Sequence, residues 1–231
     1  MIPIQKGKEP PGLVRLRNKA ADRHLSPKKA YKRLHNPLKK RVRNSLIREQ
    51  GGLCAYCMCR IPRTDVPPQV APIIIEHMVP RDPEDGRDVG QGLDYNNLLA
   101  VCHGNKSIGG EHHFEDLTCD AHRGNIEFRK VNPCDPKTLE TIYYHLDGEI
   151  DAEDPDVRYD LVETLNLNCP SSPLKAERRA ALESLIGEIT SVPGEYLLEY
   201  SKVLLEEFER ETNPKTPYVG ILIWYLKSLL D

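Results

Sequence analysis

The spacing of the cysteines constrains this chain more than any other feature of its sequence. Cys54 and Cys57 form a Cys-x-x-Cys pair in the turn-like segment Gly-Gly-Leu-Cys-Ala-Tyr-Cys, which can place both thiolates on one metal ion. Cys102 and Cys119 follow, and we interpret residues 103–118 as a loop inserted within a second pair. The four cysteines predict a tetrahedral structural zinc (Zn²⁺) site, which would contribute roughly 10–16 kcal/mol to folding.

Other residues compete for the fourth ligand position. Cys59, His103 and His122 lie near the two pairs in sequence, and each has a side chain that binds zinc. Cys134 and Cys169 lie outside the order of the motif, and we expect both to be small buried residues. The fourth position is therefore open between Cys119 and three nearby residues.

The charge of the chain is divided unevenly along its length. The 231 residues are 39% hydrophobic and 29% charged, which suits one globular domain or two small ones. Residues 1–50 contain fifteen Lys and Arg and three acids, which leaves 17 of the 32 basic and 32 of the 35 acidic residues for positions 51–231. The net charges are thus +12 and −15. The basic part suits a polyphosphate partner; alternatively, it docks on the acidic remainder of this chain or of another subunit.

No apolar segment has the length of a signal-peptide core or of a membrane span. We therefore expect a cytoplasmic protein with no membrane contact. Structural disulfides are rare in that compartment, so the seven cysteines favour metal binding.

Proline and glycine indicate where several elements begin and end. Ser26-Pro27 and Asn36-Pro37 each predict a helix start, and Gly51-Gly52 predicts the end of an amphipathic helix with a basic outer face. Further along, Ile142–Ile150 is strand-like, and the later part is helical, with helices that open near Pro173 and Pro217.

Two further motifs lie between the cysteine pairs. An apolar, strand-like run ends in Glu76 and His77, and Asn97 opens a second apolar run that ends at Cys102. The order and spacing of Cys-x-x-Cys, acid–His, Asn and Cys resemble the core of the HNH (ββα-metal) nucleases. The resemblance implies an α+β fold with a zinc-braced ββα-metal core and flanking helices. It also implies metal-assisted cleavage of phosphodiester bonds.

The same resemblance implies roles for individual residues. His77 would be the general base that takes a proton from the attacking water, and Glu76 would bind a catalytic Mg²⁺ or Mn²⁺ ion. Asn97 would orient His77 through a backbone contact or otherwise support the site, and Asn96 is the weaker choice for this role.

Asp120 directly follows the last cysteine of the zinc set, where HNH proteins usually place a further ligand of the catalytic ion. Its carboxylate is an acceptable ligand for a hard ion, and His122 or Asn125 could replace it. We expect contacts with the nucleic acid from three basic residues near the motifs, Arg81, Lys106 and Arg123. Arg123 stands where many HNH proteins carry Lys, and it keeps the charge.

A wider set of motifs resembles the PtuB-like HNH nucleases of Septu and retron systems. It extends from Pro10-Pro11-Gly12-Leu13 to Thr164-Leu165-Asn166-Leu167-Asn168 and includes residues 50–57, 93–102, 119–120 and 123–125. The resemblance implies the effector of a bacterial anti-phage defence system that acts with a PtuA-like ABC/SMC-type ATPase. In some systems a reverse transcriptase and its RNA–DNA product take part. DNA and RNA are both open as the substrate.

We predict three regions: a basic N-terminal arm with helices (1–50), the HNH nuclease core (51–131) and an acidic, mainly helical C-terminal region (132–231). Residues 1–25, including an extended arm over Met1–Gly12 that orders on binding, and the C-terminal helices are expected to contact the ATPase. The alternative function is a catalytically inert zinc-binding adaptor that holds the ATPase. Such an adaptor has no need of Glu76, His77 and Asn97.

Overall fold

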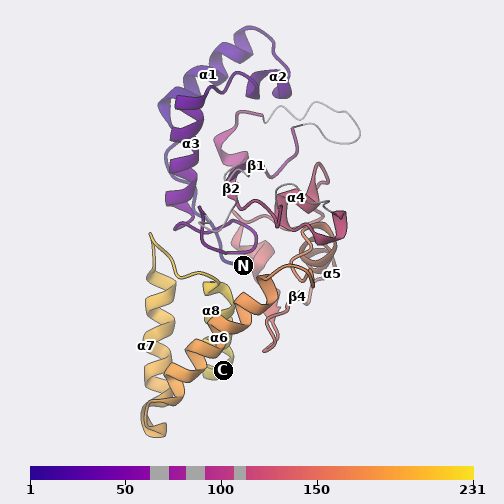
Figure 1. Ribbon diagram of the computed structural model, residues 1–231. Helices are drawn as coiled ribbons and strands as arrows, with labels where there is room; N and C mark the ends of the chain where they lie inside the picture. The colour runs from indigo at the N-terminus through magenta and orange to yellow at the C-terminus, as the bar shows by residue number, and fades with distance from the viewer. Residues whose placement is uncertain (63–72, 82–91, 107–112) are drawn as a thin grey trace.

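The computed structural model describes residues 1–62, 73–81, 92–106 and 113–231, and its fold combines helices with two small sheets (Figure 1). Three helices come first: α1 (Pro11–Asp22), α2 (Pro27–Tyr31) and α3 (Asn36–Glu49). The central part contains β1 (Ile74–His77), η1 (Tyr95–Asn97), β2 (Leu98–Val101), η2 (Phe114–Asp116) and α4 (Cys119–Arg123). The remainder contains η3 (Pro136–Leu139), β3 (Ile142–Tyr144), β4 (Ile150–Ala152), α5 (Pro155–Tyr159), η4 (Asp160–Thr164), α6 (Leu174–Thr190), η5 (Gly194–Tyr196), α7 (Leu197–Arg210) and α8 (Val219–Leu230).

Helix α3 begins and ends where the sequence predicts. Proline occupies its first turn, and the helix buries Leu38, Val42 and Leu46, which recur every four residues. Beyond its end, Gly51 and Gly52 have φ angles of +64° and +72°, in the left-handed region that glycine adopts without strain. The glycine pair therefore turns the chain sharply from α3 into the first cysteine turn.

Strands β1 and β2 form an antiparallel pair that aligns the central motifs. Ile74 pairs with Val101 and His77 pairs with Leu98. The acid–His end of β1 thus lies beside the start of β2, and Cys102 follows directly after the other end of β2. A short sheet of fixed register carries both the cysteine motif and the acid–His motif.

The buried side chain of Gln50 joins the end of α3 to β2. Its Oε1 accepts the Ala100 backbone N–H at 2.8 Å, and its Nε2 donates to the carbonyl oxygens of Ala100 at 2.7 Å and Leu53 at 2.8 Å. The amide of Gln50 thus replaces a neighbouring strand for Ala100, whose backbone groups are buried and need partners. This contact sets α3, the cysteine turn and β2 relative to one another.

The strand-like segment Ile142–Ile150 is not one strand, as the sequence suggested, but spans most of a hairpin. Strands β3 and β4 pair antiparallel, and Gly148, with φ +90°, lies in the turn between them. The sequence pattern did not reveal the turn, because the turn residues alternate in polarity much as strand residues do.

Helices α6, α7 and α8 then pack together, with Leu182, Leu226 and other apolar residues buried. No helix in the described part of the chain is both long enough and apolar enough to cross a membrane.

The first ten residues lie against the chain's own core, so the structure corrects the expectation of a free arm. Met1 and Ile4 are buried, and the N-terminal ammonium donates to the Tyr144 hydroxyl. The Ile4 N–H donates to the Pro133 carbonyl oxygen at 2.8 Å, and Lys6 Nζ donates to the Leu98 carbonyl oxygen at 2.8 Å. The segment is extended but already ordered, because its apolar residues have an internal surface to cover.

We expect Gln50→Ala to lower the free energy of unfolding by about 1–3 kcal/mol, because it leaves the buried N–H of Ala100 without the Gln50 Oε1 acceptor, whereas the Ala100 carbonyl keeps its bond from the Ala55 N–H. Urea unfolding would measure this loss. Gln5 is exposed, so Gln5→Ala is a control of the same residue type and should change stability by less than about 0.5 kcal/mol. Equal losses of stability in the two variants would show that the Gln50 side chain does not stabilise the contact between α3 and β2.

Candidate functional site

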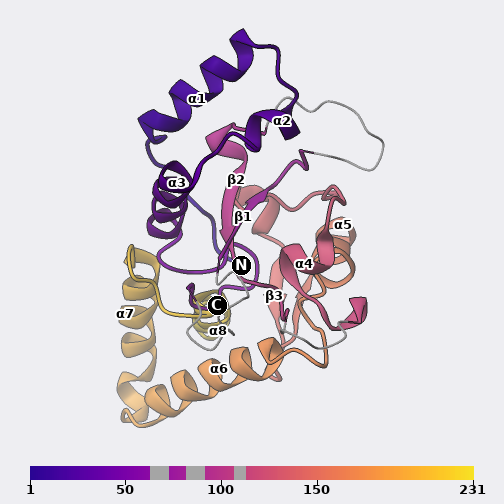
Figure 2. The ribbon, with the colours of Figure 1, turned by 45° about the horizontal axis from the view of Figure 1, so that its top comes forward.

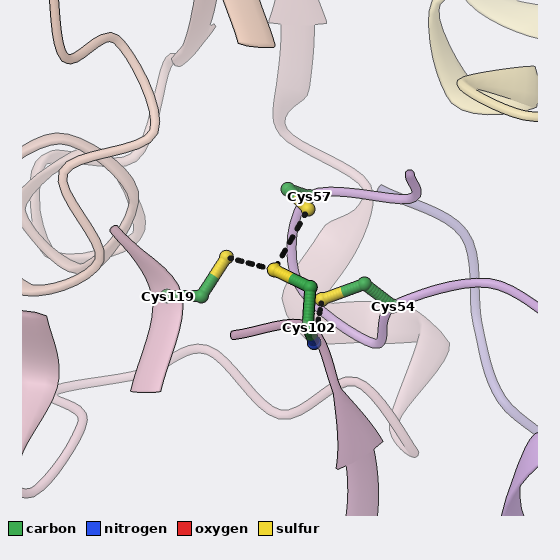
Figure 3. Close-up of side chains that lie close together, drawn as sticks. All are labelled: Cys54, Cys57, Cys102 and Cys119. Carbon is green, nitrogen blue, oxygen red and sulfur yellow. Dashed lines mark hydrogen bonds between the residues drawn. The ribbon is translucent and has the colours of Figure 1, made fainter. Parts of the chain in front are cut away.

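Four buried cysteine side chains meet in the interior (Figure 3). Cys54 and Cys57 come from the turn after α3, Cys102 follows β2, and Cys119 is the first residue of α4. The four Sγ atoms lie within 4.8 Å of one another, and Cys102 Sγ is 3.8 Å from that of Cys57 and 3.7 Å from that of Cys119. A tetrahedral ion with Zn–S bonds of about 2.3 Å separates its sulfur atoms by about 3.8 Å. The four cysteines could therefore bind zinc, as the sequence predicted.

The thiols within this cluster already share protons unequally. The hydrogen bond between the Cys102 and Cys119 side chains is the main reason that the pKa of Cys102 is lowered to about 5. The pKa of Cys119 is raised well above its ordinary value, first by that same contact with Cys102. A zinc ion would displace such protons, because thiolates are the form that binds metal.

The three residues that competed with Cys119 lie differently. The Cys59 thiol is buried next to the cluster and interacts with Cys54, Cys57 and Cys102, but it is outside the group of four. The Nδ1 atom of His122 lies 3.0 Å from the Thr164 carbonyl oxygen, and its ring stacks on Phe114. His103 is partly buried, and its Nδ1 has no hydrogen-bond partner in the described part of the chain.

Of the two cysteines expected to be buried, Cys169 is buried and Cys134 is only partly buried. Neither belongs to the four-cysteine group. Cys134 instead lies near Lys6, and desolvation raises the pKa of its thiol.

A second polar cluster lies at the end of β1, around the buried carboxylate of Glu76. Arg123 Nη1 forms an ion pair with Glu76 Oε1, and the Tyr56 hydroxyl donates to the same oxygen at 3.3 Å. Asp120, on the first turn of α4, is the second carboxylate at this position and interacts directly with Glu76. The strand end and the start of α4 thus bring two acids and one arginine together.

The pKa of Glu76 is raised well above its ordinary value. Burial is the main cause and the negative charge of Asp120 adds to it, whereas the Arg123 guanidinium opposes the shift. The buried Glu76 carboxylate and the partly buried Asp120 carboxylate repel each other, and a divalent cation would relieve that repulsion with oxygen ligands that it prefers. The donor set of Glu76 and Asp120 therefore fits a hard divalent ion.

His77 is buried beside these acids and is held as a neutral imidazole. Its Nε2 lies 3.1 Å from the Gly92 carbonyl oxygen. Because a carbonyl oxygen only accepts, Nε2 carries the proton and the lone pair lies on Nδ1. Desolvation lowers the pKa of His77 to about 4 despite the opposing effect of Gly92, so the ring is neutral at pH 7. A neutral imidazole with one oriented N–H is the form that a general base requires.

Asn97 fixes the chain immediately after His77. Its Oδ1 accepts the Val79 N–H at 2.7 Å, and its Nδ2 donates to the Val79 carbonyl oxygen at 2.9 Å. The Met78 N–H also donates to the Asn97 carbonyl oxygen, at 3.0 Å. Asn97 therefore acts on His77 through the backbone that follows it. Asn96 is exposed.

Arg123 is buried, which corrects the expectation that it contacts phosphate. Its Nη1 and Nη2 donate to the carbonyl oxygens of His77 at 2.9 Å and Met78 at 2.6 Å, and its Nε donates to the Ile126 carbonyl oxygen at 2.8 Å. Together with the Glu76 ion pair, these hydrogen bonds engage all three guanidinium nitrogens of Arg123 with groups of the same chain. Sequence indicates the charge of an arginine but not which way it points, so this internal role could not be predicted.

The other expected nucleic-acid contacts, and the proposed substitutes for Asp120, lie nearer the surface. Arg81 is partly buried, with its guanidinium 4.5 Å from the centre of the Tyr31 ring, and Lys106 is exposed. Asn125 is exposed, while His122 is partly buried and engaged with Thr164.

Two tyrosines contribute to the site without having been predicted. Tyr31 of α2 places its ring edge-to-face with that of His77, 4.7 Å between centroids, and Tyr56 donates to Glu76. Tyr56 lies inside the Cys-x-x-Cys motif, so the sequence could have indicated that it lies near the site. Tyr31 is 46 residues from His77 on a five-residue helix, and no local pattern links the two.

No protein-family model and no curated protein matches this chain. The resemblance to HNH nucleases therefore stands on the sequence motifs, with the geometry above beside it.

We expect Cys119→Ser to reduce the zinc content of the purified protein and to lower its melting temperature, because the ion would contribute folding energy to this segment. Elemental analysis and thermal unfolding measure the two effects. Cys134→Ser is the matched control, since Cys134 lies outside the cluster, and it should change neither. Full zinc occupancy in the Cys119 variant would transfer the fourth position to Cys59 or His103.

We expect Arg123→Met to destabilise the protein by about 3–5 kcal/mol, because the substitution leaves the buried Glu76 carboxylate without its cation. Urea unfolding measures the loss. The control is Arg129→Met, since Arg129 is half exposed and forms a surface ion pair with Asp156 at 3.6 Å; its removal should cost less than about 1 kcal/mol. If Arg123→Met left stability unchanged, the original expectation that Arg123 contacts a phosphate of the nucleic acid would be the better interpretation.

Proposed function

We propose that this chain is a metal-dependent HNH endonuclease that cleaves phosphodiester bonds of DNA or RNA. The observation that carries the proposal is the cluster of Glu76, Asp120 and neutral His77 beside the four cysteines. Each component has a chemical use in phosphodiester hydrolysis: a base, a pair of carboxylates for a hard cation and a rigid support. The order of the motifs in the sequence supports the same conclusion.

In this proposal Nδ1 of His77 takes a proton from the attacking water. The Gly92 carbonyl and the Tyr31 ring hold the imidazole in one orientation, and Asn97 holds the backbone behind it. Glu76 and Asp120 would hold Mg²⁺ or Mn²⁺, which stabilises negative charge on the scissile phosphate and on the leaving oxygen. Arg123 keeps the Glu76 carboxylate in place from the interior side.

The resemblance to PtuB-like nucleases supports a narrower proposal. The chain would be the effector of a Septu- or retron-type anti-phage system and would act with a PtuA-like ABC/SMC-type ATPase, in some systems with a reverse transcriptase and its RNA–DNA product. Its C-terminal helices offer exposed apolar residues for such a contact, namely Tyr196, Leu198 and Val203. The arm of residues 1–10 is less suited to the contact because it already covers the core.

The alternative is an inert zinc-binding adaptor that holds the ATPase. A purely structural role gives no reason to bury the Glu76 carboxylate next to that of the partly buried Asp120, since apolar side chains of similar volume often give equal or greater stability. The arrangement at the end of β1 favours the enzyme.

We expect His77→Ala to lose at least about 10²–10⁴-fold in cleavage rate while keeping its zinc content and melting temperature near those of the wild type. The assay is nicking of plasmid DNA and cleavage of RNA with Mg²⁺ or Mn²⁺, with and without EDTA. The ATPase from the same genome should be tested as an addition.

His145→Ala is the control, because His145 is a half-exposed residue of the β3–β4 turn. This variant should cut at the wild-type rate. Cleavage by the His77 variant at that same rate would contradict the nuclease proposal and favour the adaptor.

A further inference from the structure

A groove of about 310 Å³ lies between α1 and α3 and is lined by basic side chains. Helix α1 contributes Arg15 and Lys19, and α3 with its N-cap contributes Arg41 and His35, all four of them exposed. The other half of the lining is apolar and consists of Gly12, Leu16, Pro37 and Leu38, where α1 approaches α3. A Cβ atom on Gly12 would come within 2.7 Å of Leu38 Cδ1, so glycine permits this close approach.

Among the residues that the structure describes, no acid lines the groove. Neither α1 nor α3 has an acid in its first turn, so the positive end of each helix dipole is uncompensated there. Two of the three acids in residues 1–50 are already engaged elsewhere: Glu9 pairs with Arg17, and Glu49 pairs with Lys6 at 3.4 Å. Neither Glu9 nor Glu49 lines the groove, which leaves its cations open to an external anion.

The same helix connects this groove to the candidate catalytic residues. Lys39 of α3 lies 5.9 Å from the centre of the Tyr31 ring, and Arg81 lies 4.5 Å from it. That ring contacts His77. The cations Lys39 and Arg81 thus extend the positive charge from the groove to the edge that carries His77. Helix α3 itself is about 21 Å long. In the two views of the fold, α1 lies at the opposite end of the molecule from α6 (Figures 1 and 2).

We propose that the groove between α1 and α3 binds the phosphate backbone of the nucleic acid that the candidate site cleaves. This inference rests on the proposed nuclease function and adds a surface where the substrate is held. Arg15, Lys19 and Arg41 contact phosphate groups, whose binding releases condensed counterions. Such contacts position the substrate without reading its sequence.

A protein partner fits the groove less well than nucleic acid. The buried centre of a protein interface is depleted of charged residues and enriched in aromatic ones. Here the described lining contains Arg15, Lys19, Arg41 and His35 and no phenyl, phenol or indole ring. The composition matches a phosphate-binding surface.

The test is a binding measurement by fluorescence anisotropy without added divalent ion, so that cleavage does not interfere. Three probes of one sequence are compared: a DNA duplex of about 20 base pairs, longer than α3 can span, single-stranded DNA and single-stranded RNA. Affinity is measured between about 50 and 200 mM salt. The variant carries Arg15→Gln, Lys19→Gln and Arg41→Gln. The matched control carries Lys137→Gln, Lys202→Gln and Arg210→Gln, which remove the same charge from exposed positions elsewhere.

For duplex DNA we expect the groove variant to bind more weakly and to reduce the slope of log K against log salt by about 3, near one unit for each lost phosphate contact. The reduction for single strands is about 2. The control variant should keep the wild-type slope, and both variants should melt like the wild type. The probe that the wild type binds most tightly at equal salt concentration identifies the strandedness and sugar of the substrate.

The proposal is overturned if the groove variant keeps the wild-type slope, if the control loses as much, or if the wild type binds none of the probes. It is also overturned if the groove variant loses copurification with the ATPase but keeps nucleic-acid binding. Failure of the nuclease proposal looks different: groove-dependent binding would persist while the wild type cut neither DNA nor RNA with Mg²⁺ or Mn²⁺. If the wild type cuts nucleic acid and the groove variant binds it as tightly as the wild type does, only the groove proposal fails and the nuclease proposal stands.

Discussion

The meeting of Cys54, Cys57, Cys102 and Cys119 is the constraint on which the rest of this structure depends. It joins the turn after α3, the end of β2 and the start of α4, three segments with little secondary structure of their own. Because Asp120 follows Cys119 on the same helical turn, the position of that cysteine also sets the carboxylate beside Glu76. A zinc ion at the cysteines would thus fix the polar cluster without taking part in its chemistry.

The polar cluster is held from the opposite side by Arg123. This arginine comes from the same short helix as Cys119, and its guanidinium reaches Glu76 and the backbone of the two residues that follow it. One five-residue helix therefore supplies Cys119 to the cysteine cluster and both Asp120 and Arg123 to Glu76. The helix is too short to be stable alone. Its position comes from tertiary contacts, among them the hydrogen bond from the Cys119 N–H to the Leu165 carbonyl oxygen at 2.8 Å.

The sequence was sufficient for features that depend on spacing and insufficient for those that depend on orientation. Four cysteines in the right order indicated the zinc-binding group although sixteen residues separate Cys102 from Cys119, and proline and glycine indicated the bounds of α3. The inward turn of Arg123, the packing of Met1 and Ile4 on the core, and the contact of Tyr31 with His77 could not be predicted. Each of these depends on which side of a short element faces the interior, and segments of five residues are too short for a periodic pattern to decide that.

The electrostatics of the two ends of the β1–β2 pair bear on why such a site would persist. One end carries thiols, whose charge a zinc ion would neutralise, and the other carries Glu76 with Asp120, whose repulsion Arg123 offsets only in part. Removing water from the Glu76 carboxylate costs several kcal/mol, and the Arg123 ion pair recovers a share of this free energy. The remaining imbalance is negative and lies next to an imidazole that burial keeps neutral. In the nuclease that we propose, a divalent cation would balance this charge without protonating His77, and the arrangement of Glu76 and Asp120 would then serve the metal-dependent reaction.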